Sequence, residues 1–344
     1  MVKFVDDMWQ KIWEQVHAKK QLLAFFVVAL FAGFLIGHFY FPSSLASTCD
    51  TDLPYLRPSL DCIDSDAKEE ILSKLRDRLK VQTQGYLNSN KAMRISVFVR
   101  DLSTNRFAEV NDSEVYYLAS LLKLPLLIGG FKLAEVEPRI LDQTVRYTGA
   151  PNLYGTQYYD VPEKLEVGKV YTVKELMRRA VVNSDNTAAQ ILFDYYPNQF
   201  MDRIMEALGL RFKKESGETE NLVTTRSYAN VFRMLYNTSY LTSIYSNEAL
   251  SILTKASFNK GLIAKLPSDV VVAHKFGERS FTRASTSEVV LHQLHECGLV
   301  YVKGGKDPYT ICVMTEGRDF NDLEEILQQI SLSVYDEMSQ GTPD

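Results

Sequence analysis

The sequence predicts an α/β (α+β) fold in which a five-stranded antiparallel sheet is covered by the two terminal helices and interrupted by an inserted all-helical lobe. Segments with strand-like alternation lie near both ends of the polar part of the chain, whereas about residues 118–265 have mostly helical apolar spacing. An uncharged apolar segment at residues 21–41 predicts one N-terminal transmembrane helix before this domain.

The composition is that of a folded protein and excludes several classes. The 344 residues are 46% hydrophobic and 24% charged, which is too apolar for a disordered chain. A formal net charge of −5 argues against a nucleic-acid partner, because such proteins normally carry a basic surface. Four cysteines are too few for a disulfide-dense scaffold.

The transmembrane prediction rests on charge and length. No Asp, Glu, Lys or Arg lies between Gln21 and Phe41, and a helix of that length spans about 31 Å, enough to cross a hydrocarbon core. Four lysines precede the segment, whereas the first basic residue after it is Arg57. This asymmetry predicts a cytoplasmic N-terminus, with the rest of the chain outside the cell membrane. A cleaved signal peptide is the alternative.

Two short segments flank this span. Residues 1–20 place both tryptophans and several aliphatic side chains on one helical face, which predicts a cytoplasmic amphipathic leader. Residues 42–66 lack periodic apolar positions and are expected to form a tether, in which Cys49 and Cys62 either pair or remain free thiols. The domain itself is expected to comprise residues 67–344.

The first elements of the domain are a helix and a hairpin. Residues 67–84 carry charged side chains opposite an apolar stripe, the pattern of an amphipathic helix; the stripe consists of Ile71, Leu72, Leu75 and Leu79. Residues 94–100 and 106–110 alternate as strands on either side of a turn, which predicts a β-hairpin. Within the lobe, Thr172-Val173-Lys174-Glu175 is a capping box that opens a helix.

Three strands and a helix are expected to complete the fold. Residues 270–276, 297–303 and 309–315 are strand-like, and the last two flank a Gly-Gly-Lys-Asp-Pro turn. Cys297 and Cys312 lie roughly opposite each other in that hairpin and are expected to be core thiols. Residues 322–335 predict the closing helix.

The tetrapeptide Ser120-Leu121-Leu122-Lys123 suggests a nucleophile and its base. On a helix this S-x-x-K spacing places the hydroxyl and the amine on one face, and a desolvated amine can accept the proton of the hydroxyl. The spacing recurs at Ser65–Lys68 and Ser257–Lys260, but only Ser120 opens a long apolar segment that buries its lysine. A helix N-cap is the structural alternative for Ser120.

Two further tripeptides have the chemistry of a site. Ser184-Asp185-Asn186 occurs once and follows a predicted helix, where it is also good cap and turn chemistry. Lys275-Phe276-Gly277 lies at the end of a predicted strand, where a glycine lets a ligand backbone approach closely. A second K-x-G pattern, at Lys303-Gly304-Gly305, is better explained by the hairpin turn.

In this order the three motifs resemble the signature of the class A serine β-lactamase and penicillin-binding protein superfamily, S-x-x-K, S-D-N and K-T-G. The resemblance covers about residues 85–340 and includes the order of the elements, so it implies a β-lactamase/transpeptidase-like fold. It also implies an oxyanion hole made by two backbone N–H groups, those of Ser120 and Glu278. The catalytic residues that it implies are Ser120 as nucleophile, Lys123 as base, Ser184 as proton shuttle, Asn186 as partner of Lys123 and of the substrate amide, and Lys275 as the cation across the cleft.

One departure from the family pattern concerns substrate binding. The family carries Ser or Thr in the middle of K-T-G, where the hydroxyl binds the substrate carboxylate, but Phe276 has no hydroxyl. Arg279 or Arg283 is expected to bind that carboxylate instead. The expected substrate-binding residues are Phe276, Gly277, Glu278 and Arg279.

A second departure concerns deacylation. Class A enzymes carry E-x-x-L-N, whose glutamate activates the hydrolytic water, whereas residues 209–223 hold Glu215, Glu218 and Glu220 without that pattern. A solvated polar loop is the structural interpretation of these glutamates. We therefore expect acylation to be followed by slow deacylation.

These features together predict a membrane-anchored, extracytoplasmic serine hydrolase that is acylated by a β-lactam or a related amide. The alternatives are a D-Ala-D-Ala carboxypeptidase-like peptidoglycan enzyme and a non-catalytic ligand-binding or sensor domain that keeps the fold. No metal or cofactor is expected, because His292 and His295 have no second cluster of ligands nearby in the sequence. Three tyrosines in a loop with Gly and Pro are expected either to wall the cleft or to pack its rim: Tyr154, Tyr158 and Tyr159.

Overall fold

The computed structural model describes residues 72–210, 212–213, 219–220, 222–282, 289–302 and 308–340. All of them belong to one compact unit, Thr51–Asp344. The predicted leader, transmembrane span and tether (1–20, 21–41 and 42–66), with Cys49 and Cys62, lie outside the described residues. Within the described ranges, no helix combines the length and the apolar character needed to span a membrane.

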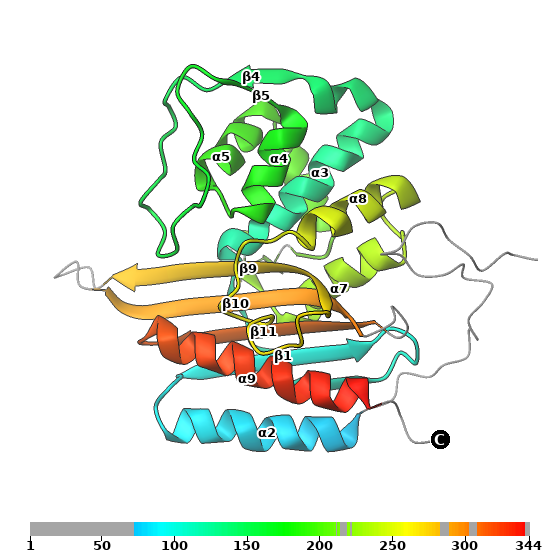
Figure 1. Cartoon of the computed structure of the whole chain (residues 1–344), viewed down its shortest axis with the longest axis vertical. Coiled ribbons are helices and arrows are strands. Elements are labelled where there is room, and N and C mark those ends of the chain that lie inside the picture. The colour runs from blue at the N-terminus through cyan, green and yellow to red at the C-terminus, as the bar shows by residue number, and fades with distance from the viewer. Residues whose placement is uncertain are drawn as a thin grey trace, which may run out of the picture. The chain divides into compact units, whose positions relative to one another are not determined.

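A five-stranded antiparallel sheet with the order β2-β1-β11-β10-β9 forms one half of the domain, as Figure 1 shows. The strands are β1 (Arg94–Asp101), β2 (Phe107–Val110), β9 (Val271–Thr282), β10 (Val289–Tyr301) and β11 (Tyr309–Gly317). This confirms the prediction that strands from both ends of the chain form one antiparallel sheet. The turn predicted before β11 lies largely outside the described residues.

Strands β9 and β10 are longer than the sequence pattern predicts, with 271–282 in place of 270–276 and 289–301 in place of 297–303. Strand β9 continues past Phe276, where Glu278 pairs with Leu294 and Arg279 pairs with Gln293 of β10. Strand β9 lies at the edge of the sheet, and edge strands commonly carry charged residues that interrupt the apolar alternation. The extension matters because it places Glu278 and Arg279 on a strand next to the predicted site.

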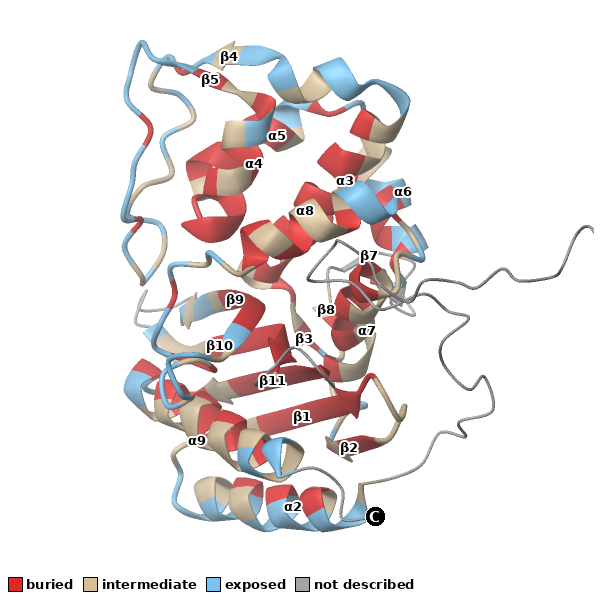
Figure 2. Ribbon diagram, turned by 45° about the vertical axis from the view of Figure 1, so that its right-hand side comes forward, coloured by how far each residue is buried: buried red, intermediate tan, exposed pale blue. Residues whose placement is uncertain are grey.

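The terminal helices cover one face of the sheet, as predicted (Figure 2). Helix α2 (Ser73–Asn88) contributes the buried side chains Leu75 and Leu79. Helix α9 (Phe320–Ser339) buries a stripe with helical spacing against the sheet; it includes Leu323, Ile326, Leu327 and Ile330. The side chain of Asp319 caps α9 by accepting a hydrogen bond from the N–H of Asn321, 2.8 Å away.

The lobe inserted between β2 and β9 is mainly helical. Helix α7 packs against β1, β10 and β11, on the face of the sheet away from α2 and α9 (Figure 1). The helices are η2 (Ala119–Leu122), α3 (Lys123–Val136), η3 (Pro138–Asp142), α4 (Val173–Val182), α5 (Asn186–Tyr195), α6 (Phe200–Ala207), α7 (Thr225–Tyr236) and α8 (Ser243–Leu253).

The prediction of an all-helical lobe is wrong in one respect, because short strand pairs join its segments. They are β3 (Tyr116–Tyr117) with β8 (Leu222–Val223), β4 (Thr144–Arg146) with β5 (Val170–Thr172), and β6 (Phe212–Lys213) with β7 (Thr219–Glu220). Pairing satisfies backbone hydrogen bonds in stretches too short to show a strand pattern. The β4–β5 pair joins the two ends of a long loop that borders the site.

Half of the predicted capping box at α4 is present. The Thr172 side chain accepts a hydrogen bond from the N–H of Glu175, 3.1 Å away. The carboxylate of Glu175 does not return to the N-cap backbone, because it binds the guanidinium groups of Arg178 and Arg179 instead. Charged donors compete well for a carboxylate, so the sequence pattern overestimates the reciprocal bond.

Cys297 and Cys312 lie directly opposite each other on β10 and β11, as predicted. They are not free core thiols, because they form a disulfide. Opposed positions on neighbouring strands bring the two sulfur atoms within bonding reach, and the sequence pattern does not reveal the oxidation state.

Candidate active site

The S-x-x-K motif lies where a 3-10 turn meets an α-helix. Ser120 is in η2, and Lys123 is the first residue of α3. The N-cap residue of α3 is Leu122, so the alternative interpretation of Ser120 as a helix cap is wrong. Ala119 has a left-handed backbone conformation with φ of 47°, a strained geometry that is uncommon away from functional sites.

The amine of Lys123 is buried among polar groups from two parts of the lobe. Its Nζ lies 3.0 Å from Ser120 Oγ, 3.2 Å from Ser184 Oγ, 2.5 Å from the Ser184 carbonyl oxygen and 2.6 Å from Asn186 Oδ1. The residue is only 4% exposed. Burial lowers the pKa of Lys123 to about 7, although the nearby carboxylates of Asp185 and Glu278 oppose the shift. A large fraction of the amine is therefore neutral at neutral pH.

The Ser184-Asp185-Asn186 turn is held in a conformation that residues other than glycine seldom adopt. Ser184 has φ of 51°. Asp185 caps α5 by accepting hydrogen bonds from the N–H groups of Thr187 and Ala188, at 2.8 and 3.0 Å. The hydroxyl of Tyr154 donates to the other carboxylate oxygen of Asp185, 3.1 Å away. These bonds orient the turn so that Ser184 and Asn186 both reach Lys123.

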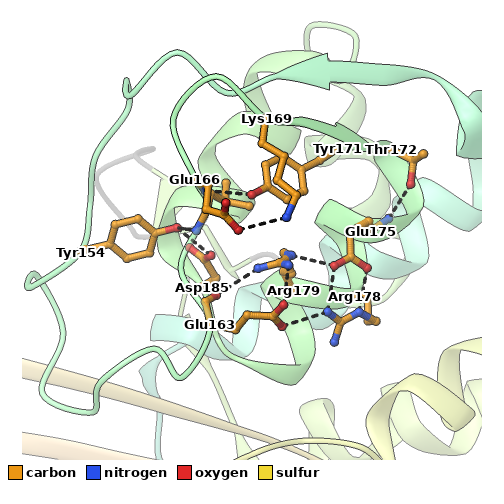
Figure 3. Close-up of polar contacts among 11 residues, drawn as sticks. Tyr154, Glu163, Glu166, Lys169, Tyr171, Thr172, Glu175, Arg178, Arg179 and Asp185 are labelled. Carbon is orange, nitrogen blue, oxygen red and sulfur yellow. Dashed lines mark hydrogen bonds and ion pairs between the residues drawn. The ribbon is translucent and has the colours of Figure 1, made fainter.

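Figure 3 shows a network of hydrogen bonds and ion pairs among side chains of α4 and the preceding loop, next to the same turn. Arg179 is buried, and its guanidinium donates to Glu163 at 2.6 Å and to Glu175 at 2.7 Å. The carbonyl oxygen of Arg179 accepts hydrogen bonds from the N–H groups of Asn183 and Asp185. The turn is thus bound by the backbone carbonyl of Arg179, while the side chain of that residue is anchored by Glu163 and Glu175.

Lys275 reaches the same turn from β9, on the opposite side of the cleft. Its Nζ donates to Ser184 Oγ at 2.9 Å and to the carbonyl oxygen of Phe276 at 2.8 Å. Burial, with a smaller contribution from Lys123, lowers the pKa of Lys275 well below its usual range. The structure thus brings all five predicted catalytic residues together, with Ser184 Oγ between the two lysine amines.

Gly277 lies against the segment that carries Ser120. A Cβ atom at this position would lie 3.0 Å from the backbone nitrogen of Leu121 and 3.1 Å from the carbonyl oxygen of Leu118. The absence of a side chain therefore lets the η2 turn pack closely on β9.

Replacing Gly277 with alanine is expected to lower the rate of Ser120 acylation about 10- to 100-fold, because the new methyl group displaces the turn that holds the nucleophile. We also expect a loss of about 1–3 kcal/mol in the free energy of unfolding. Gly85→Ala is the matched control: this exposed helical glycine has no atom within 4 Å of the added Cβ, so the change should stabilise the protein by about 0.5–1 kcal/mol. Stopped-flow measurement of the acylation rate and thermal unfolding check both variants. An acylation rate of Gly277→Ala equal to that of the wild type would contradict this role.

A cavity of about 370 Å³ opens beside Ser120. Its polar wall includes Lys123, Asn186, Glu278 and Arg279, and its apolar wall includes Leu153, Ala189 and Phe193. The guanidinium carbon of Arg279 lies 4.1 Å from the centre of the Tyr117 ring, and this stacking holds the group in the cavity lining. Arg283, the other candidate for a carboxylate, lies outside the described residues.

Phe276 does not line the Ser120 cavity. Its ring stacks on Phe258, with centroids 4.1 Å apart, and meets the ring of Tyr159 edge-on at 5.6 Å. The Nζ of Lys275 lies 4.3 Å from the centre of the Phe276 ring, so this ring borders the amine of Lys275. Glu278 is partly buried, and its carboxylate accepts a hydrogen bond from the N–H of Tyr158 at 2.7 Å.

The glutamates of the segment 209–223 remain untested. Glu215 and Glu218 lie outside the described residues, and only the backbone of Glu220 is described. The tyrosines of the 151–165 loop have separate places. Tyr154 binds Asp185, whereas Tyr158 stacks on Phe320 and Tyr159 donates to Glu324 of α9.

Sequence reasoning missed the part that Asp185 and Arg179 play in the site. Asp185 was part of a recognised tripeptide, and the pattern of an acidic residue directly before a helix was the available signal. Arg179 gave no signal, because its importance depends on which groups the fold places next to it. Tyr154 was expected at the cleft or its rim, but its bond to Asp185 was not foreseen.

The comparisons with known proteins agree with this geometry. A family model described as the beta-lactamase enzyme family matches residues 78–338. A beta-lactamase of Bacteroides uniformis is 25% identical over 299 residues, which cover 80% of this chain and 95% of that protein.

Among solved structures, a class A beta-lactamase from Bacteroides cellulosilyticus matches with a TM-score of 0.64 and 20% identity, over 78% of this chain and 99% of that one. A mutant of PBP-A, solved as an acyl-enzyme complex with penicillin G, matches with a TM-score of 0.63 and 19% identity, over 79% and 99%. At these identities the structures establish the fold alone. The family model spans most of the chain and confirms the predicted resemblance and enzyme class, so the chain belongs to the beta-lactamase enzyme family.

Proposed function

We propose that this protein is a membrane-anchored, extracytoplasmic serine enzyme that forms an acyl-enzyme on Ser120 with a β-lactam or a related amide. The observation that carries the proposal is the buried amine of Lys123, 3.0 Å from Ser120 Oγ and with a pKa of about 7. A neutral amine at that distance is a suitable general base for a serine hydroxyl.

Acylation follows from the contacts around Ser184. The neutral amine of Lys123 takes the hydroxyl proton of Ser120 while Oγ bonds to the carbonyl carbon. Ser184 Oγ then gives its proton to the leaving nitrogen as the carbon–nitrogen bond breaks, and it recovers a proton from the Lys123 ammonium, 3.2 Å away. Lys275, 2.9 Å from Ser184 Oγ, favours the developing negative charge on that oxygen.

The oxyanion of the tetrahedral intermediate is assigned to the backbone N–H groups of Ser120 and Glu278. Both residues line the same cavity, and the close packing of Gly277 against η2 holds their two segments together. A preorganised donor of this kind contributes about 3–4 kcal/mol to transition-state stabilisation. Asn186, whose Oδ1 binds Lys123 and whose Nδ2 donates to Thr156, is oriented to hold the substrate amide at the cavity wall.

Slow deacylation is the second part of the proposal. The segment 209–223 lacks the E-x-x-L-N pattern that supplies a hydrolytic base in class A enzymes. Among the described residues that line the Ser120 cavity, Glu278 is the one carboxylic acid, and its Oε1 is bound by the N–H of Tyr158. The acyl-enzyme of a PBP-A mutant with penicillin G supports a β-lactam as acyl donor.

The proposed location rests on the uncharged segment 21–41 and the lysines before it. The disulfide between Cys297 and Cys312 supports it, because disulfides persist mainly in oxidising compartments outside the cytoplasm.

Incubation of the purified full-length chain with a chromogenic cephalosporin tests the proposal. We expect intact mass spectrometry to show one covalent adduct, located on Ser120, that persists for minutes while little free product accumulates. Fast steady-state turnover would contradict slow deacylation. The absence of both an adduct and turnover would contradict the acyl-enzyme itself.

A further inference from the structure

A second cavity, of about 410 Å³, lies beside the Ser120 cavity and has no part in the acylation chemistry described above. Its walls come from four segments: the 151–165 loop, the end of α4, the stretch after α8, and β9. Four aromatic side chains line it together with polar residues; they are Tyr158, Tyr159, Phe258 and Phe276. We call it the aromatic cavity.

The aromatic cavity lies on the leaving-group side of the site. It is lined by Asn183, which directly precedes Ser184, and by Phe276, which directly follows Lys275. Ser184 Oγ lies 2.9 Å from Lys275 Nζ and is the proposed proton donor to the leaving nitrogen. The first atom of the leaving group must therefore lie next to residues that border the aromatic cavity. The acyl part of the substrate is then expected to bind in the Ser120 cavity, which Leu153 also lines.

The rings in the aromatic cavity are already arranged as a rigid apolar surface. Phe258 and Phe276 stack with an interplanar angle of 19°. Tyr159 meets Phe258 edge-on, with centroids 5.0 Å apart, and its hydroxyl donates to Glu324 at 2.8 Å. Tyr158 stacks on Phe320 at 4.2 Å. Such preorganised rings favour a flat apolar ligand, because little side-chain freedom is lost when it binds.

The charges around the cavity disfavour an anion. Lys260, which lines it, lies 3.6 Å from the carboxylate of Glu324 and above the ring of Tyr159. Asp160 adds a carboxylate to the same lining. Lys275 Nζ, which lies 4.3 Å from the centre of the Phe276 ring, is already bound by Ser184 Oγ and by the Phe276 carbonyl oxygen. Two hydroxyls of the lining are engaged as well: Ser257 donates to the carbonyl oxygen of Val182 at 2.9 Å, and Tyr159 donates to Glu324.

We infer that the enzyme prefers an uncharged aromatic or similarly flat apolar leaving group, bound in the aromatic cavity, to one that carries a carboxylate there. This inference rests on the proposed acyl transfer to Ser120 and adds the substrate class. Phe276 is then a specificity-determining residue for the leaving group.

The test compares two phenylacetylglycyl esters with the same acyl part. One releases 3-hydroxybenzoate and the other releases its neutral methyl ester, so the leaving groups differ in charge but share the ring. First-turnover release is measured with the full-length chain, and each rate is divided by that of hydroxide hydrolysis to remove intrinsic reactivity. We expect the neutral ester to be faster by about tenfold or more.

Two variants assign the preference to the cavity. Phe276→Thr should reduce the ratio of neutral to anionic rates about tenfold, because it removes a ring and adds a hydroxyl for the carboxylate. Tyr158→Ala should reduce the ratio of neutral to anionic rates about threefold. Because Tyr158 is 56% exposed, this substitution leaves the buried core intact. Thermal unfolding confirms that each variant is folded.

The outcomes separate the two proposals. If both esters react no faster than with Ser120→Ala, the proposed acyl transfer fails and this inference fails with it. If the esters acylate Ser120 but the anionic one is equal or faster, the inference alone is overturned. It is also overturned if neither folded variant changes the ratio.

Discussion

Replacement of Ser120 with alanine is expected to abolish covalent labelling by a cephalosporin and to lower any β-lactam consumption by about 10⁴-fold or more. The loss should be this large because the hydroxyl forms the bond to the acyl group, and Lys123, 3.0 Å away, then has no proton to remove. Intact mass spectrometry of the full-length variant, read against the wild type over the same time, measures the result.

The other copies of the S-x-x-K spacing provide the control for this variant. Ser65 precedes Lys68 by three residues, as Ser120 precedes Lys123, but it belongs to the predicted tether. Ser65→Ala should therefore acylate at the wild-type rate. Persistent labelling of Ser120→Ala at another residue would mean that the motif was assigned to the wrong serine.

The rate of Ser120 acylation is expected to rise with pH around a midpoint near 7. Burial lowers the pKa of Lys123 to about 7, and only the neutral amine can accept the serine proton. Well below this pKa the neutral fraction falls about tenfold per pH unit, so the rate should increase about 50-fold between pH 5 and pH 7 and level off above pH 8, about 100-fold above its value at pH 5. First-turnover rates with a cephalosporin, measured from pH 5 to 9, give the profile.

Lys123→Arg is the matched variant for the pH profile, because a guanidinium keeps its proton throughout this range. It should acylate at least a hundredfold more slowly at pH 8 and should lack the midpoint near 7. A wild-type profile in this variant would assign the general base to another group. Asp185 and Glu278 face Lys123, and burial raises the pKa of both carboxyls, so the profile below pH 6 also reports on them.

The same shift has a consequence for stability. Between about pH 7 and the ordinary lysine pKa of 10.5, the unfolded chain holds a proton on Lys123 that the folded protein has lost. The free energy of unfolding therefore rises with pH across this window. Protonation of Lys123, the proposed general base, therefore destabilises the folded protein relative to the unfolded chain.

The main features of the fold could be predicted because they depend on local patterns. The alternation of β1 and the helical stripe of α2 are visible in single segments. Strand β1 ends one residue later than predicted, whereas α2 begins six residues and ends four residues later than predicted. The five residues predicted to be catalytic, which meet around Ser184, fall in three short contiguous motifs. Each motif is ambiguous alone, and their order removes the ambiguity.

The features that could not be predicted depend on contacts between distant segments. The outer half of β9 has polar residues whose strand conformation comes from pairing with β10. The place of Phe276 depends on Phe258 and Tyr159, which lie in two separate loops. The support that Arg179 gives to the Ser184 turn requires the end of one helix to meet the start of another.

Gly277 shows how such a contact constrains evolution. Every side chain begins with a Cβ, so every substitution meets the backbone of Leu118 and Leu121, whatever the chemistry of the new residue. Selection for any activity at Ser120 therefore excludes almost all mutations at this position, even when the preferred substrate changes. Phe276, one residue away, lines the aromatic cavity, so a change of its side chain changes the shape of the proposed leaving-group site. Conservation of Gly277 among relatives would reflect the packing of the Ser120 segment, whereas variation at Phe276 would reflect differences in substrate.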